Sequence, residues 1–77
     1  MSKLQLIDAK TMEKLLLKLG FRKIRQKGSH AFFRHEDGRT TTVPYHSNKD
    51  LARPLIRVII NEININVQEY NEIINNL

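Results

Sequence analysis

Three short strand-like segments follow one another between residues 21 and 43, and this succession constrains the fold more than any other feature. Gly28-Ser29 separates the first two segments, and Asp37-Gly38 separates the second from the third. Both pairs are typical of hairpin turns, because glycine adopts the positive φ angles that tight turns require. The sequence therefore predicts a three-stranded antiparallel sheet, with strands over residues 21–26, 29–35 and 40–43.

Segments with helical periodicity flank the predicted strands. A first helix is expected between Asp8, as its N-cap, and Gly20, which ends it. A second begins near Pro54, and a third follows Asn66. The expected apolar stripes are Ala9, Met12, Leu15, Leu16 and Leu19, then Leu55, Val58, Ile59 and Glu62, then Val67, Tyr70, Ile73, Ile74 and Leu77. Because the strands are consecutive, the predicted fold class is α+β.

Charge is distributed unevenly along the 77 residues. Residues 1–60 contain all 13 Lys and Arg and five acidic residues, whereas residues 61–77 contain three Glu and no Lys or Arg. Such a basic body is equally consistent with a polyanionic partner and with solvated charge that only maintains solubility. The cations that flank Gly28-Ser29-His30 favour nucleic acid as the partner. The chain has no Cys, which excludes disulfides and thiolate metal sites. Its apolar runs are far shorter than the roughly 20 residues of a membrane span, and no signal-peptide core is visible near the N-terminus. We therefore expect a cytoplasmic protein.

The turn at Gly28 is the candidate site, because a histidine follows it within a cationic segment. Histidine gains and loses a proton near neutral pH. RNA carries its own nucleophile, the 2′-hydroxyl, so cleavage needs an acid, a base and positive charge near the phosphate. We predict that His30 is the acid or the base, and both roles stay open, as does the alternative of a histidine at a hairpin end with no catalytic role. The surrounding cations are Arg22, Lys23, Arg25, Lys27, Arg34 and Arg39.

The residues next to His30 have expected roles in holding RNA. Arg25 and Lys27 would position phosphates, within a basic neighbourhood that also includes Arg34. The amides of Gly28 and Ser29 would donate hydrogen bonds to a phosphate.

The other two histidines have different expectations. His46, just after the third strand, is a candidate second proton-transfer group, and a loop role for it is equally open. His35 is expected to be structural or solvated, because five strand residues place it about 16 Å from His30. The three histidines form no helical i, i+4 pair with a carboxylate set, so we expect no metal and no other cofactor.

Alternation leaves open which side of the sheet the helices cover. On the second strand, one face carries His30, Phe32 and Arg34, and the other carries Ala31, Phe33 and His35. On the first strand, Phe21, Lys23 and Arg25 are expected on one face and Arg22, Ile24 and Gln26 on the other. Phe32, Phe33 and Tyr45 are of the type that fills a core or its rim, although one on a free face would stack an unpaired base.

A set of short motifs points to a known family. They are Leu19-Gly20-Phe21, Gln26-Lys27-Gly28-Ser29-His30, Phe33-Arg34-His35 with Asp37-Gly38-Arg39, Val43-Pro44 with His46, and Ile56-Arg57-Val58-Ile59-Ile60. Together, over about residues 8–62, they resemble the HicA-type toxins, small mRNA-cleaving members of toxin–antitoxin pairs.

The resemblance implies a single domain, residues 1–77, with a fold like that of double-stranded-RNA-binding domains. Its core would be residues 8–62, and residues 66–77 would add a C-terminal helix. It also implies an mRNA-cleaving ribonuclease with His30 at the active site, blocked by an antitoxin of the HicB type. Monomer and homodimer both stay open. The alternatives are a non-catalytic RNA-binding module of the same fold, and a module that binds only proteins, which would show no salt-dependent affinity for RNA.

Overall fold

The computed structural model describes residues 3–46 and 49–77. Its elements are α1 (Ala9–Lys18), β1 (Arg22–Lys27), β2 (His30–Arg34), β3 (Thr40–Pro44), α2 (Arg53–Glu62) and α3 (Val67–Asn75). The strands form one antiparallel sheet in the order β1-β2-β3. The predicted α+β class and strand order are therefore confirmed, and the likeness to double-stranded-RNA-binding domains stays a prediction. The first two residues of the N-terminal stretch, and residues 47–48 of the expected loop, lie outside the described residues.

Helix α1 begins and ends where its sequence predicts. The side chain of Asp8 accepts a hydrogen bond from the backbone N–H of Thr11, as an N-cap does. At the other end, Gly20 has a φ of 94°. The N–H groups of Gly20 and Phe21 donate to the carbonyls of Leu17 and Leu16, which is the Schellman pattern. The expected stripe is buried at its first four positions, and Leu19 packs at its edge.

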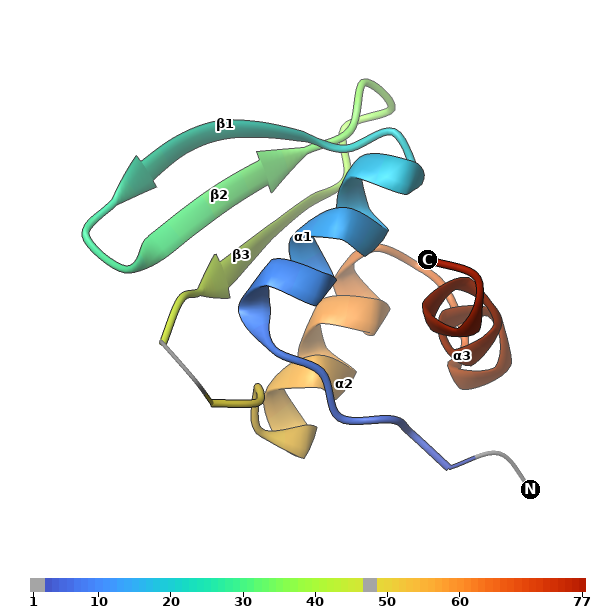
Figure 1. Cartoon of the computed structure of the whole chain (residues 1–77). Coiled ribbons are helices and arrows are strands. Elements are labelled where there is room, and N and C mark those ends of the chain that lie inside the picture. Colours follow the sequence, from blue (N-terminus) through green and yellow to red (C-terminus); the bar gives the residue numbers. More distant parts are fainter. Residues whose placement is uncertain (1–2, 47–48) are drawn as a thin grey trace.

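The helices lie on one side of the sheet. Figure 1 shows α1 and α2 next to β3, while the β1–β2 hairpin extends past them and α3 lies on the opposite side of the molecule from the hairpin. The core between the layers includes Ala31, Phe33 and Val43 from the sheet, all at 0% exposure. In contrast, every residue of β1 is exposed. The hairpin therefore presents much of its surface to solvent.

The predicted stripe of α2 is partly wrong. Ile56, Ile59 and Ile60 are the buried residues of this helix, whereas Val58 is 50% exposed and Glu62 is exposed. The segment offers an apolar residue at nearly every position from 55 to 60, so periodicity alone did not identify the buried face. Pro54 lies in the first turn, as expected.

Helix α3 packs with the N-terminal segment. It begins with a capping box formed by Asn66 and Glu69. Tyr70 is fully buried, and its hydroxyl donates to the carbonyl of Gln5 at 2.6 Å. Burial raises the pKa of Tyr70 to about 12. Leu77 falls outside the helix and is 48% exposed, so its predicted place in the stripe is wrong. Within residues 3–46 and 49–77, no helix is long and apolar enough to cross a membrane.

The strict alternation predicted for β1 is also wrong. The pairing with β2 shifts between Lys23 and Arg25, so that Ile24 is the extra residue of a β-bulge. Directly opposite residues of an antiparallel pair share a face. Arg25 pairs with Phe32 and Arg22 pairs with Arg34, so the two arginines lie on the same face rather than on opposite ones.

Candidate functional site

The two faces of β2 have different environments. Ala31 and Phe33 are completely buried under the helices. His30 and Arg34 point the other way and are exposed, with Phe32 half-buried between them. We call the side of the sheet that carries these three residues the open face. The question that alternation left open is therefore decided, and the imidazole of His30 lies on the solvent side.

The turn before His30 has the geometry of a tight hairpin. Lys27 pairs with His30, so Gly28 and Ser29 are the only two residues of the loop. Gly28 has a φ of 59° at the first of these positions, the place where type II′ turns require glycine. A Cβ on Gly28 would meet no atom within 4 Å, so this glycine is needed for its backbone angle and leaves space beside the turn. The carbonyl of Ser29 accepts from the N–H of Tyr45 at 2.6 Å, which ties the turn to the end of β3.

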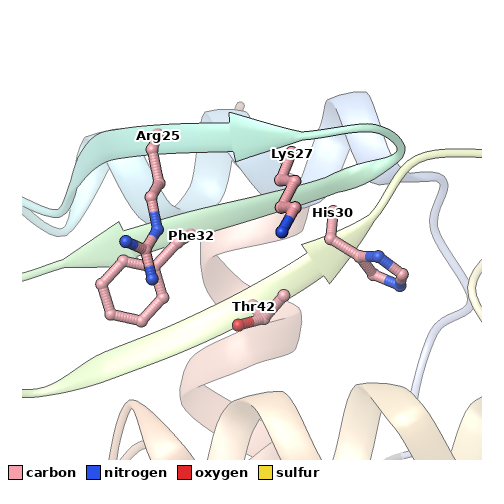
Figure 2. Close-up of a pocket in the computed structure, with 5 residues that line it drawn as sticks. All are labelled: Arg25, Lys27, His30, Phe32 and Thr42. Carbon is pink, nitrogen blue, oxygen red and sulfur yellow. The ribbon is translucent and has the colours of Figure 1, made fainter.

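The open face contains a concavity of about 340 Å³. It is lined by Arg25, Lys27, His30, Phe32 and Thr42. Figure 2 shows Lys27 between the ring of Phe32 and the imidazole of His30, with Thr42 below them on the neighbouring strand. Three of the predicted site residues thus come together: Arg25, Lys27 and His30. The lining residues include no carboxylate.

The cations of the open face have no acidic partners. Within the described part of the chain, no carboxylate lies in ion-pair distance of Arg22, Arg25, Lys27 or Arg34. Arg22 and Arg34 are also directly opposite each other in the register. Like charges in that arrangement repel and cost stability. The open face is therefore an arrangement that an anion would stabilise.

Two cations that the sequence grouped around the turn are engaged elsewhere. Lys23 lies 3.4 Å from the carboxylate of Glu13 and 5.1 Å from the ring centre of Tyr45. The hydroxyl of Tyr45 donates to the same carboxylate, and burial together with this bond raises the pKa of Tyr45. Arg39 binds Asp37 and the carbonyl of Ile63. Both side chains therefore stabilise the fold and lie outside the concavity.

The other predicted site residues lie near the concavity without lining it. Gly28 and Ser29 form the adjoining turn, and Arg34 lies on the open face two residues beyond Phe32. His46 is exposed and follows Tyr45, whose backbone is bonded to the turn. The chain therefore brings His46 back to the same end of the sheet as His30.

His35 lies on the helix side of β2, at the far end of the sheet. Its ring packs edge-on against Phe21 with centroids 5.1 Å apart. Its Nδ1 accepts a hydrogen bond from the N–H of Asp37 at 3.1 Å. The same nitrogen is 3.1 Å from a carboxylate oxygen of Asp37. These contacts support the expected structural role.

Two residues of the concavity were not predicted as site residues. Phe32 is two residues from His30 on the same strand, so alternation predicts that the two side chains share a face. Phe33 is an aromatic on the opposite face, however, so the sequence did not show which of the two rings would lie on the open face. Thr42 is the register partner of Phe32. Nothing in the sequence marks Thr42 among the neighbouring threonines, because its place depends on the pairing of β2 with β3. Among the described residues, no three His, Asp or Glu side chains are grouped as a metal site would require.

The fold and the open face define the class of this protein: a small α+β domain whose helices back one side of a three-stranded sheet and whose other side is cationic. The family model described as HicA toxin of bacterial toxin-antitoxin matches residues 9–65. The chain therefore belongs to the HicA toxin family, as the motifs predicted. This membership implies a cognate antitoxin as partner. No curated protein matches the sequence.

Proposed function

We propose that this toxin is an endoribonuclease that cleaves mRNA without a metal ion, and that His30 transfers a proton in the reaction. The observation that carries the proposal is the position of the imidazole. It is exposed on the open face, in a concavity that also contains Lys27 and Arg25. Carboxylates, the usual ligands of Mg²⁺, are missing from the lining residues that the structure describes. The charge that the phosphate needs would come from the protein's own cations.

The reaction requires two proton transfers. The 2′-oxygen attacks the adjacent phosphorus, and its proton passes to a base. The bond from phosphorus to the 5′-oxygen breaks, and that oxygen takes a proton from an acid, leaving a 2′,3′-cyclic phosphate and a 5′-hydroxyl. A neutral imidazole serves as the base and an imidazolium as the acid. We assign His30 one of these roles and His46, at the same end of the sheet, as the candidate for the other.

The remaining residues of the open face would hold the RNA backbone. Lys27 and Arg25 lie beside His30 and would bind phosphates next to the cleaved one, and Arg34 would bind farther along the strand. The N–H groups of Gly28 and Ser29 would donate to the reacting phosphate, since a Cβ at Gly28 would meet no described atom within 4 Å and a ligand has space there. Such donors stabilise the charge that develops during the reaction.

The antitoxin would control this site by covering it. We propose an antitoxin of the HicB type that binds the open face, where Arg22, Arg25, Lys27 and Arg34 have no carboxylate partner among the described residues and favour an acidic surface. We also propose that the toxin acts in the cytoplasm, where its mRNA substrate is found. A single domain comprising residues 8–62, extended by α3, would suffice for the reaction.

The test is RNA cleavage in the presence of excess chelator, with the parent and with His30→Ala. We expect the parent to cut, and His30→Ala to retain its circular dichroism while it loses cleavage. RNA with a 2′-deoxy sugar at the cut position should stay intact. Cleavage that stops on chelation, or that survives His30→Ala, would overturn the catalytic assignment. A parent that binds RNA in a salt-dependent manner but never cuts it would favour the non-catalytic RNA-binding module instead.

A further inference from the structure

Phe32 differs from the other aromatic residues near the sheet because its ring lies on the open face. Phe21 and Phe33 are buried in the core at 2% and 0% exposure. Tyr45 is held by its bond to Glu13. Figure 2 shows the ring of Phe32 projecting into the concavity, beside the side chain of Arg25. A single exposed apolar residue needs no explanation on its own, so the surroundings of the ring decide what it does.

The guanidinium of Arg25 lies over the ring of Phe32, 5.4 Å from its centre. This pairing follows the register set by the Gly28 turn, because Lys27 is opposite His30 and Arg25, two residues before Lys27, is therefore opposite Phe32 on the same face. The bulge at Ile24 comes directly before Arg25 in the chain, and bulges are common beside functional sites. Thr42 is opposite Phe32 on β3, and its hydroxyl makes no hydrogen bond to any residue that the structure describes. The ring is thus surrounded by a planar cation and a free hydroxyl.

We propose that Phe32 and Arg25 form a binding site for one unpaired nucleobase, next to the phosphate held at Lys27 and His30. This inference rests on the proposed function and identifies the form of RNA that the site accepts. Aromatic rings and guanidinium planes are the surfaces on which proteins stack single-stranded bases. The hydroxyl of Thr42 would bond to the edge of the base. The volume of about 340 Å³ falls within the range of roughly 300–1,000 Å³ that small-molecule sites occupy.

The distance from Phe32 to His30 would allow one RNA strand to place a base on Phe32 and a phosphate at His30. Phe32 and His30 are two residues apart on the same face of β2, which is about 7 Å along a strand. A base and a phosphate of the same or the adjacent nucleotide would therefore reach both side chains. Bases inside an A-form duplex are stacked on one another and are not available to a side chain. The site accordingly selects single-stranded RNA, and Phe32 helps to decide which phosphate reaches His30.

The experiment uses the full chain carrying His30→Ala, so that the RNA remains intact. The probe is a short single-stranded oligoribonucleotide with the fluorescent base 2-aminopurine, placed at each internal position in turn. Stacking of this base on Phe32 should quench its fluorescence at one position. We expect Phe32→Leu to abolish that quenching and to weaken binding about tenfold, within the roughly 1–3 kcal/mol that base–aromatic stacking contributes. Phe32→Tyr should retain both properties because it keeps the ring.

Leu17→Ala is the matched control, because Leu17 is 51% exposed on α1, away from the open face. It should leave affinity and quenching unchanged. Equal affinity and quenching in Phe32→Leu and its parent, with RNA binding still salt-dependent, would overturn the base site and leave the proposed function standing. Loss of all RNA binding in every protein tested would overturn both. A duplex of the same sequence that binds as tightly as the single strand would overturn the selection for unpaired RNA.

Discussion

The two turns of the sheet contain the same kinds of residue, but the side chains are bonded within the fold in one turn and face solvent in the other. We call residues 27–30 the Gly28 turn and residues 35–39 the Gly38 turn. Each has a glycine with positive φ, a histidine and a cation. In the Gly38 turn the histidine and the arginine are bonded within the fold. In the Gly28 turn the side chains of Lys27 and His30 make no hydrogen bond or ion pair to the described residues.

The difference teaches that local composition does not separate a structural turn from a candidate site. A polar side chain that is bonded inside the fold stabilises it by about 1 kcal/mol. A side chain whose donors face solvent contributes little to stability and stays available to a ligand. The Gly38 turn lies against Phe21 and α2's C-terminus, which supply partners. The Gly28 turn projects at the end of the hairpin, where such partners are absent among the described residues.

The largest effect should come from substituting the two histidines separately. His30→Gln is expected to lower RNA cleavage by roughly 10²–10⁴-fold, as loss of a general acid or base does, with the melting temperature unchanged. His35→Gln should leave cleavage nearly intact and lower stability by about 1 kcal/mol, because its ring loses the contact with Phe21. Cleavage rates and thermal unfolding of both variants measure this. Similar losses of cleavage in the two would remove the distinction between the turns.

The next largest effect concerns the arginines. Arg39→Ala should lower the free energy of unfolding by about 2 kcal/mol, since it leaves the carbonyl of Ile63 without its donor and removes a cation from the ring of Phe21. Arg34→Ala, on the open face, should change it by less than about 0.5 kcal/mol. Urea denaturation of both proteins is the measurement. A stability loss in Arg34→Ala comparable to that in Arg39→Ala would mean that the open face is structural.

The two turn glycines offer a matched pair. Gly28 and Gly38 have φ angles of 59° and 103°, and a Cβ on either would meet nothing within 4 Å. Replacement by Ala should therefore cost about 1 kcal/mol at each position through backbone strain alone. Only Gly28→Ala should also slow cleavage, because it shifts the amides beside His30. Equal cleavage by the two variants, measured at a temperature where both are folded, would contradict the role of the Gly28 turn.

The smallest effect is a pH dependence confined to the Gly38 turn. The N–H of Arg39 donates to the carboxylate of Asp37 and holds the pKa of this group below its ordinary value. A lowered pKa stabilises the folded state above pH about 4, and this contribution is lost as the pH falls further. Asp37→Asn should therefore flatten the fall of stability below pH 4 without changing cleavage at neutral pH. A stability–pH curve identical to the parent's would show that this bond contributes nothing.

Much of the fold was predictable because it depends on short-range signals. The caps at Asp8 and Asn66, the stop at Gly20 and the two turn glycines each act within a few residues, and the structure has all of them. Errors arose where a choice depended on distant partners. The bulge at Ile24 and the buried face of α2 follow from packing against other elements, which local periodicity does not report.

By itself, the amino-acid sequence determined the α+β class, the order of the strands and the concentration of cations around a glycine turn with a histidine. Only the tertiary structure decided which side of β2 the helices cover, and therefore that His30 and Phe32 face solvent while Ala31 and Phe33 are buried. It also decided which cations are engaged within the fold, because Lys23 meets the carboxylate of Glu13 on α1 and Arg39 donates to the carbonyl of Ile63 at the end of α2. The physical reason is that the exposure and pairing of a side chain depend on contacts between helices and strands. Turns and caps, in contrast, depend on residues that are close to one another in the sequence.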